Sequence, residues 1–186
     1  MSATAILVTI AVVVIVALLW VIKVYNGLVR LSNLKNEAWS GVDVQLKRRF
    51  DLVPNLVETV KGYAKHEEGT LEKVVAARSA ITSAPTQDAR IEAENHLTST
   101  LRSLFAVAEA YPDLKANQNF TELQRELSSL ENEIQMARRY YNGTVREYNT
   151  AIQTFPAVVI SRQLGYTEAP FFEAEEESRA PVQVKF

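Results

Sequence analysis

Apolar residues follow two different patterns along the chain, one continuous and one periodic. From Thr4 to Ile22, 19 consecutive residues carry no charged side chain, and 13 of them are Val, Ile or Leu. As an α-helix rising about 1.5 Å per residue, this run would be roughly 28 Å long, close to the thickness of the hydrocarbon core of a bilayer. We therefore predict that residues 1–23 form an N-terminal single-pass transmembrane anchor.

A cleaved signal peptide is the competing interpretation of this run. Such a peptide has a basic beginning, a shorter apolar segment and small residues at its cleavage site. Here Met1-Ser2-Ala3 carries no charged side chain, and no pair of small residues stands near the end of the run. We expect the helix to be retained, with Trp20, Lys23 and Tyr25 at the membrane interface on its C-terminal side.

The flanking cations predict the orientation of this anchor. Lys23, Arg30 and Lys35 follow the apolar run, with Lys47-Arg48-Arg49 further on, whereas no Lys or Arg precedes it. Cytoplasmic flanks of membrane helices are rich in Lys and Arg. We therefore expect the N-terminus outside and the rest of the chain in the cytoplasm.

Beyond the anchor, apolar residues recur every three or four positions, which is the spacing of one helix face. Glycine is sparse, and no run alternates apolar and polar residues as a half-buried strand would. Four such stretches cover residues 24–53, 56–84, 97–111 and 120–155. The spacing predicts an all-α fold, in which short connections place successive helices antiparallel.

The fourth stretch is the most regular. Its apolar residues step three and four positions from Phe120 to Phe155 over five heptads, as in the seam of a coiled coil. Asn119 with Glu122 resembles a capping box at its start, and Pro156 closes it. Packing in the core of a bundle explains this seam better than a free-standing coiled coil does.

Pro54 leaves two architectures open. If the helix only kinks there, residues 23–82 form one helix of roughly 90 Å, longer than its partners could cover. If the chain reverses there, four long helices form an up-down-up-down bundle and bury their apolar faces mutually. Asp51 could then cap a helix with Pro54 in its first turn. We predict the reversal, and with it an antiparallel four-helix bundle over residues 24–166.

The C-terminal end differs in composition from this bundle. Residues 157–164 read as a short helix that ends at Gly165, and residues 167–186 as an acidic, flexible tail. Residues 1–172 hold 18 basic and 18 acidic residues, so the net charge of −2 resides in residues 173–186. A solvated tail is the simpler interpretation, and a docking segment for a basic partner is the alternative.

The composition argues against catalysis. The chain has no cysteine, which excludes thiolate metal sites and cysteine nucleophiles. Its two histidines, His66 and His96, lack the spacing of metal-ligand pairs, and no phosphate loop, dinucleotide fingerprint or nucleophile elbow is present. We predict a protein that is not an enzyme and has no cofactor, metal or catalytic residue. The near-neutral charge also argues against a nucleic-acid partner.

A few polar residues stand out as interaction or register candidates. Arg49 lies in the sharpest basic cluster, where ion pairing inside the bundle is the preferred role. Tyr25-Asn26-Gly27 recurs as Tyr141-Asn142-Gly143, and Tyr148-Asn149 follows one heptad later. An Asn beside a helix seam can fix register or partner choice; the plain alternative is a surface Asn next to a core Tyr. The candidates are Asn26, Arg49, Tyr141, Asn142, Tyr148 and Asn149.

A series of short segments, in order along the chain, matches one protein family. These segments are Tyr25-Asn26, residues 42–49 and 51–57, Lys61-Gly62-Tyr63-Ala64, His66-Glu67, Ala77-Arg78, Ala110-Tyr111-Pro112, residues 137–142, Tyr148-Asn149 and Phe155-Pro156. From Tyr25 to about Phe172 the chain thus resembles proteins of the LemA family. The resemblance implies a bacterial membrane protein with one N-terminal helix and an antiparallel bundle, at the cytoplasmic (inner) membrane. It implies no reaction and no catalytic residues.

One anchor, long amphipathic helices and no recognisable chemistry lead to two functional hypotheses. The first is a membrane-anchored structural or scaffolding protein that self-associates through its helices as a homo-oligomer. The second is a membrane-tethered adaptor or sensor that recruits a partner protein or ligand through its bundle surface or its tail. A metal-dependent enzyme is a weaker third hypothesis.

Overall fold

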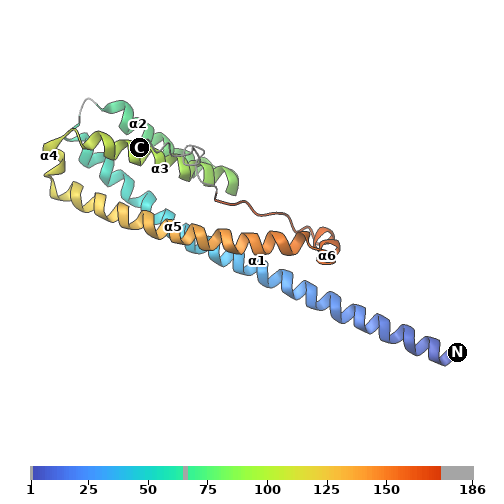
Figure 1. The fold of residues 1–186 in the computed structure, drawn as a ribbon. Helices are drawn as coiled ribbons and strands as arrows, with labels where there is room; N and C mark the ends of the chain where they lie inside the picture. The colour runs from blue at the N-terminus through green and yellow to red at the C-terminus, as the bar shows by residue number, and fades with distance from the viewer. Residues whose placement is uncertain (1, 65–66, 173–186) are drawn as a thin grey trace, which may run out of the picture. The chain divides into compact units, whose positions relative to one another are not determined.

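Every regular element in the described part of the chain is an α-helix. The computed structural model describes residues 2–64 and 67–172. The helices, labelled in Figure 1, are α1 (Ala3–Lys61), α2 (Glu68–Ser83), α3 (Gln87–Ala108), α4 (Pro112–Lys115), α5 (Gln118–Gln153) and α6 (Ala157–Gln163). The all-α class that the apolar spacing predicts is confirmed, whereas the up-down-up-down order of a four-helix bundle stays a prediction.

The chain divides into two compact units. Unit 1 consists of Met1–Ser40 and Tyr140–Ala169, and unit 2 consists of Gly41–Arg139 and Pro170–Phe186. Helices α1 and α5 each extend from one unit into the other, so each contributes one part to unit 1 and one part to unit 2.

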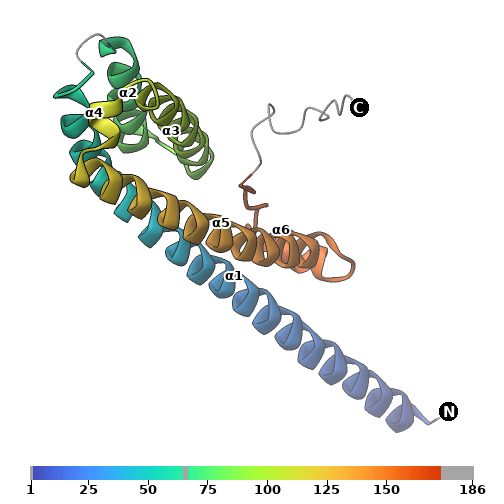
Figure 2. The ribbon, with the colours of Figure 1, turned by 60° about the vertical axis from the view of Figure 1, so that its left-hand side comes forward.

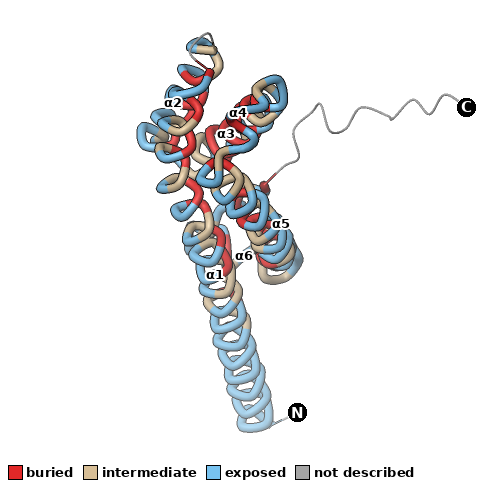
Figure 3. Tube along the Cα trace, turned by 90° about the vertical axis from the view of Figure 1, so that its left-hand side faces the viewer, coloured by how far each residue is buried: buried red, intermediate tan, exposed pale blue. Residues whose placement is uncertain are grey.

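In unit 1, the first turns of α1 are exposed along their whole length. All residues from Ser2 to Lys23 are exposed, which the tube in Figure 3 shows as a continuous pale blue stretch. By length and composition this part of α1 is able to cross a membrane. From Leu28 onward α1 packs along the C-terminal part of α5 (Figures 1 and 2), and both helices contribute fully buried side chains. The buried apolar residues of these two helices in unit 1 are Leu28, Ala38, Tyr141, Val145, Tyr148 and Ile152.

Unit 2 is built around one apolar core to which five helices contribute, α4 through Leu114 alone. The side chains project at the three- and four-residue steps that place them on one face of each helix. Burying a single side chain of this size stabilises the folded chain by about 1.5–3 kcal/mol relative to leaving it exposed. The core includes Val53, Leu56 and Val60 from α1; Leu71, Val74, Ala77 and Ile81 from α2; Leu97, Leu101 and Leu104 from α3; and Phe120 and Leu127 from α5.

The predicted reversal at Pro54 is wrong, because α1 passes through Pro54 and ends only at Lys61. Proline has no backbone N–H, so the carbonyl four residues earlier, that of Phe50, loses its helical hydrogen bond. Arg78 of α2 replaces that bond, because its Nε donates to the Phe50 carbonyl oxygen at 3.1 Å. Its guanidinium also lies 3.8 Å from the centroid of the Phe50 ring. These contacts offset part of the cost of a proline inside the helix.

The chain turns instead between Lys61 and Glu68, and two tyrosines fasten this turn. The Tyr63 hydroxyl accepts a hydrogen bond from Asn117 Nδ2 at 2.8 Å, and the Tyr111 hydroxyl donates to Glu67 Oε1 at 3.1 Å. Asn117 also caps α5, because its Oδ1 accepts from the Phe120 amide at 3.0 Å. The expected capping box at Asn119 is therefore wrong, and the cap lies two residues earlier.

The end of the described chain follows the sequence more closely. α6 ends at Gln163, and Gly165 has a φ of +72°, the left-handed conformation that favours glycine at a helix end. Within the predicted tail, residues 167–172 are described, and Ala169 and Phe172 are buried. Residues 173–186, which hold the excess of acidic side chains, lie outside the described residues.

Candidate functional site

The residues predicted at the membrane interface lie on one exposed part of α1. Trp20 is 38% exposed and Tyr25 is 45% exposed, and Lys23 between them is also exposed. Amphipathic aromatic side chains followed by a cation are typical of the level of lipid headgroups. The geometry permits this role, and the role itself stays a prediction.

In unit 2, Arg49 is the centre of a buried hydrogen-bonded ion cluster. Its Nη2 donates to Glu94 Oε2 at 2.6 Å and to the Glu94 carbonyl at 3.1 Å. Its Nη1 donates to Thr98 Oγ1 at 2.7 Å and to Glu131 Oε2 at 3.0 Å. Because Glu94 and Thr98 belong to α3 and Glu131 belongs to α5, this one side chain joins three helices.

The charged groups of this cluster are unusually deeply buried, because the side chains of Arg49 and Glu94 are each only 1% exposed. Burial raises the pKa of Glu94, and the nearby guanidinium groups, above all that of Arg49, act against that increase. Glu131 is 30% exposed and connects the pair to the surface. The arrangement compensates charge inside the unit.

Sequence reasoning anticipated ion pairing by Arg49 but missed Glu94 and Thr98. A usable signal was present in α3, where Glu94 lies three residues from both Ile91 and Leu97, on the apolar face of the helix. A charged residue in that position predicts a buried partner of opposite charge.

A pocket of about 330 Å³ lies beside this cluster in unit 2. Its lining mixes both charge signs with apolar side chains, so no single class of ligand is favoured. The lining residues are Arg49, Thr98, Leu101, Arg102, Phe105, Leu127, Ser128, Glu131 and Asn132.

Two of the register candidates in unit 1, Tyr148 and Asn149, bind the segment that follows α6. The Tyr148 hydroxyl donates to the Thr167 carbonyl at 3.0 Å. Asn149 pairs with Ala169 in both directions: its Nδ2 donates to the Ala169 carbonyl at 3.0 Å, and its Oδ1 accepts from the Ala169 amide at 2.9 Å. Burial raises the pKa of Tyr148 and lowers that of Lys35, whose Nζ lies 4.6 Å from the Tyr148 ring centroid. Tyr148 and Asn149 therefore hold the chain to itself.

The remaining candidates separate by exposure. Tyr141 is fully buried, with its ring centroid 5.3 Å from that of Trp39. Asn142 is half-buried on α5, and Asn26 is exposed on α1. Of the Tyr-Asn repeats, only the first thus leaves its asparagine on an exposed surface.

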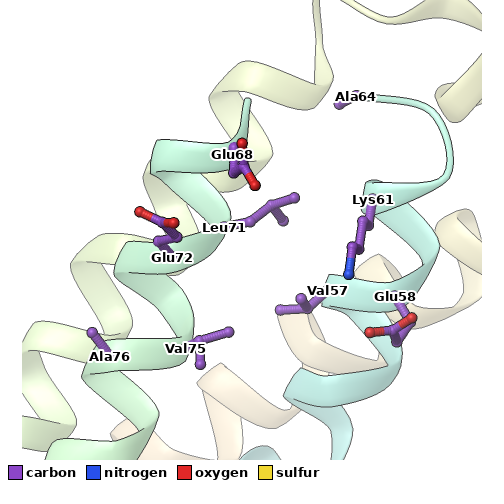
Figure 4. A pocket seen from close by; sticks show the side chains of 9 residues that line it. All are labelled: Val57, Glu58, Lys61, Ala64, Glu68, Leu71, Glu72, Val75 and Ala76. Atoms are coloured by element: carbon purple, nitrogen blue, oxygen red, sulfur yellow. The ribbon is translucent and has the colours of Figure 1, made fainter. Parts of the chain in front are cut away.

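A further pocket of unit 2 is a groove that sequence reasoning did not find. It has a volume of about 660 Å³ and lies between the end of α1 and the start of α2. Figure 4 shows Val57 of α1 and Leu71 and Val75 of α2 pointing toward one another across it. Its polar side chains are three carboxylates and one ammonium group, so its rim is negative. We name it the acidic groove; the charged lining residues are Glu58, Lys61, Glu68 and Glu72.

Within residues 2–64 and 67–172, no three His, Cys, Asp or Glu side chains form a group that could hold a metal ion. His66, one of the two histidines, lies outside these residues.

Comparison with known proteins identifies relatives across most of the chain. The LemA family model matches residues 38–186. Protein LemA of Metamycoplasma hominis is 28% identical over 158 residues, which cover 84% of this chain and 72% of the relative. The magnetosome proteins MamQ 1 and MamQ 2 of Paramagnetospirillum magneticum are each 24% identical over 184 residues, which cover 85% of this chain and 68% of each relative.

Proposed function

The chain belongs to the LemA family, and from this premise we propose that it is a membrane-anchored, non-catalytic scaffolding protein that self-associates through its helices. Family membership and the apolar start of α1 are consistent with a membrane-associated protein. The finer elements of the proposal are a single pass across the bacterial cytoplasmic membrane, the N-terminus outside, and lipid and a second copy as the principal partners.

The observation that supports self-association is the continuity of α1. The exposed apolar run ends at Ile22, and the same helix packs in unit 1 from Leu28 onward. No flexible linker separates the two segments, so anchors that associate in the membrane would bring their packed segments together. Membrane helices associate by close packing and interhelical hydrogen bonds, and the exposed Asn26 lies just outside the apolar run.

Two further observations support a non-catalytic role. Glu94, a carboxyl group whose pKa is raised by burial, is enclosed in its pair with Arg49. Tyr148 and Asn149 are occupied by backbone groups of the same chain. These polar groups stabilise the fold and leave none of the three free to act on a substrate.

Native mass spectrometry of the full-length protein released from lipid nanodiscs tests self-association. We expect a defined oligomer, and a monomer at micromolar concentration would overturn the proposal. The chain has no cysteine, so single-cysteine variants locate the contact. When isolated membranes are oxidised with copper phenanthroline, we expect N26C to form disulfide-linked dimers, whereas S79C, at an exposed position of α2, should not.

The acidic groove supports a second function, that of a membrane-tethered adaptor. Its apolar floor suits the apolar face of a helix, and its rim of three carboxylates against one ammonium suits cationic flanks. The occupant that we propose is therefore a cationic amphipathic helix of a partner protein.

Binding of a synthetic helical peptide with leucine on one face and lysine on the other tests the adaptor function. Replacing Glu68 and Glu72 by lysine should weaken binding about tenfold or more, which corresponds to about 1.4 kcal/mol. The control matched in charge is E126K/E147K, at two exposed carboxylates of α5 outside the groove. Equal loss in both variants would indicate attraction by general charge and would contradict the proposal.

A further inference from the structure

The connection from α5 to α6 presents large apolar side chains to solvent. Phe155 is 79% exposed, Val159 is 52% exposed and Leu164 is 50% exposed. All three belong to unit 1, within ten residues of one another. A cluster of such side chains marks a surface that contacts lipid or protein. We name residues 154–164 the α5–α6 tip.

Ring contacts in unit 1 place this tip along α1. Lys35 lies over the Tyr148 ring, and Trp39 contacts Tyr141. Along the contact, residue numbers therefore increase on α1 where they decrease on α5. The two helices are thus antiparallel (Figures 1 and 2). Because both helices rise by the same distance per residue, these two contacts can be extended along α1 and α5. The extension places Phe155 level with residues 25–28 of α1.

This level coincides with the surface of the predicted membrane. Residues 25–28 follow Ile22, the last residue of the apolar run, by three to six positions, or about 5–9 Å of helix. The headgroup layer on one side of a bilayer is about 5–8 Å thick. Phe155 would therefore reach the headgroups whenever residues 4–22 span the hydrocarbon core.

The charges around the tip are mostly positive, and the exception is Glu168, which lines a pocket together with Arg162. Lys23 and Arg30 of α1 and Arg162 of α6 are exposed at this end of unit 1. Neither residues 22–36 nor residues 154–167 contain an acidic side chain, and the nearest ones in sequence are Glu37 and Glu168. Cations beside exposed aromatic and aliphatic side chains suit an anionic lipid surface.

The tip is also fastened to α5 and does not depend on lipid for its shape. Ser161 is 1% exposed, and its Oγ donates to the Ile152 carbonyl at 2.7 Å. The Tyr166 amide donates to the Ser161 carbonyl at 3.0 Å, and the Tyr166 ring lies 6.3 Å from that of Tyr148. The exposed apolar side chains are thus presented on a preformed element.

We propose that the α5–α6 tip is a second membrane contact, in which Phe155, Val159 and Leu164 enter the headgroup layer of an anionic bilayer. The proposal rests on the membrane anchoring proposed above. It adds a point at which unit 1 binds the bilayer surface beside its own anchor. Lipid is favoured over a protein partner because the level of the tip and its charge both match the membrane surface.

Tryptophan quenching in vesicles of brominated phosphatidylcholine and phosphatidylglycerol tests this contact with the full-length chain. The chain has two tryptophans, Trp20 and Trp39. W39F leaves Trp20 as a reporter of the anchor, W20F leaves Trp39 as a reporter further from the membrane, and W20F/W39F/F155W reports the tip. The helical circular dichroism of the three variants should match that of the unmodified chain.

We expect quenching of the tip reporter to be close to that of Trp20 and several-fold stronger than that of Trp39. It should weaken when phosphatidylglycerol is omitted or when Arg162 is replaced by glutamine. A tip reporter quenched no more than Trp39, with Trp20 quenched, would overturn the tip contact and leave the anchor intact. An unquenched Trp20 would overturn the anchor itself. Blue-shifted but unquenched emission from the tip would indicate a protein contact and would also overturn the proposal.

Discussion

Arg49 and Glu94 illustrate how a buried ion pair acts on stability. Removing both charges from water costs several kcal/mol per ion, and their attraction and hydrogen bonds offset this cost. The pair is therefore not a large net source of stability. It is a strong constraint, because either charge alone would be buried without its nearest partner.

The first prediction follows from that asymmetry. Arg49→Met should lower the free energy of unfolding by about 3–5 kcal/mol, because it leaves Glu94 buried beside no adequate partner. Adding Glu94→Leu should recover a large part of this loss. Urea unfolding of the full-length protein in detergent, followed by circular dichroism, measures both. Additive losses in the double variant would contradict the compensation described here.

The second prediction concerns pH. The pKa of Glu94 is raised above its ordinary value of 4.5, chiefly by burial. Between 4.5 and the folded-state pKa, the folded protein binds more protons than the unfolded chain, so this group makes stability fall as pH rises. Glu94→Gln removes the titration. The unfolding free energy of the unmodified protein minus that of E94Q should therefore decrease as pH rises from 4.5, and a difference independent of pH would refute this account.

The third prediction tests the bond from Arg78 to the Phe50 carbonyl. Arg78→Ala should cost about 1.5–3 kcal/mol, the usual contribution of a hydrogen bond to a charged group. Pro54→Ala restores a backbone N–H to the helix, so the same arginine substitution should cost less in that background. A double-mutant cycle from urea unfolding measures the difference. An equal cost in both backgrounds would show that Arg78 does not serve the proline site.

At the scale of elements, sequence patterns predicted helix type better than helix ends. The three- and four-residue spacing identified the apolar faces of α3 and α5, and Gly165 marked the end of α6. Pro54 misled, because the compensating contact comes from Arg78, 24 positions later in the chain. Rules that consider only neighbouring residues in the sequence cannot predict such a contact. The cap of α5 was predicted at Asn119, two residues after its actual position at Asn117. Both residues are asparagines near the start of the helix, and the preference for Asn at an N-cap does not distinguish them.

The fourth prediction belongs to the C-terminal part of α5. Asn149→Leu keeps the approximate volume of the side chain but leaves the buried amide and carbonyl of Ala169 without their partners, at a cost of about 1–3 kcal/mol per group. Amide hydrogen exchange at residues 167–169 should accelerate, while exchange within α5 should change little. E147Q, at an exposed neighbour, is the control. Unchanged exchange in N149L would show that the pairing does not hold this segment.

At the scale of the whole molecule, the candidate surfaces were harder to predict than the fold. The exposed run at the start of α1 follows directly from composition. The acidic groove requires Glu58 of α1 to face Glu68 and Glu72 of α2, an arrangement that depends on where α1 ends. Because that end was misplaced at Pro54, the groove was not visible in the sequence. Glu94 was hidden for a related reason, since its partner lies on another helix.

The fifth prediction concerns topology. Since the chain has no cysteine, a single added thiol reports the side of the membrane on which it lies. S2C should react with a membrane-impermeant maleimide on intact bacterial cells, whereas E72C, at an exposed position of α2, should react only after the membrane is opened. The opposite pattern would reverse the proposed orientation.

The arginine at the proline site also has a mechanical consequence. A helix with one backbone hydrogen bond missing is most compliant at that point, so a lateral load on the end of α1 would concentrate its bending near Pro54. The bond that resists this bending comes from a side chain of α2. The stiffness of α1 at Pro54 therefore depends on a side chain of the neighbouring helix α2. Any force that pulls Arg78 away from the Phe50 carbonyl would make α1 easier to bend at Pro54.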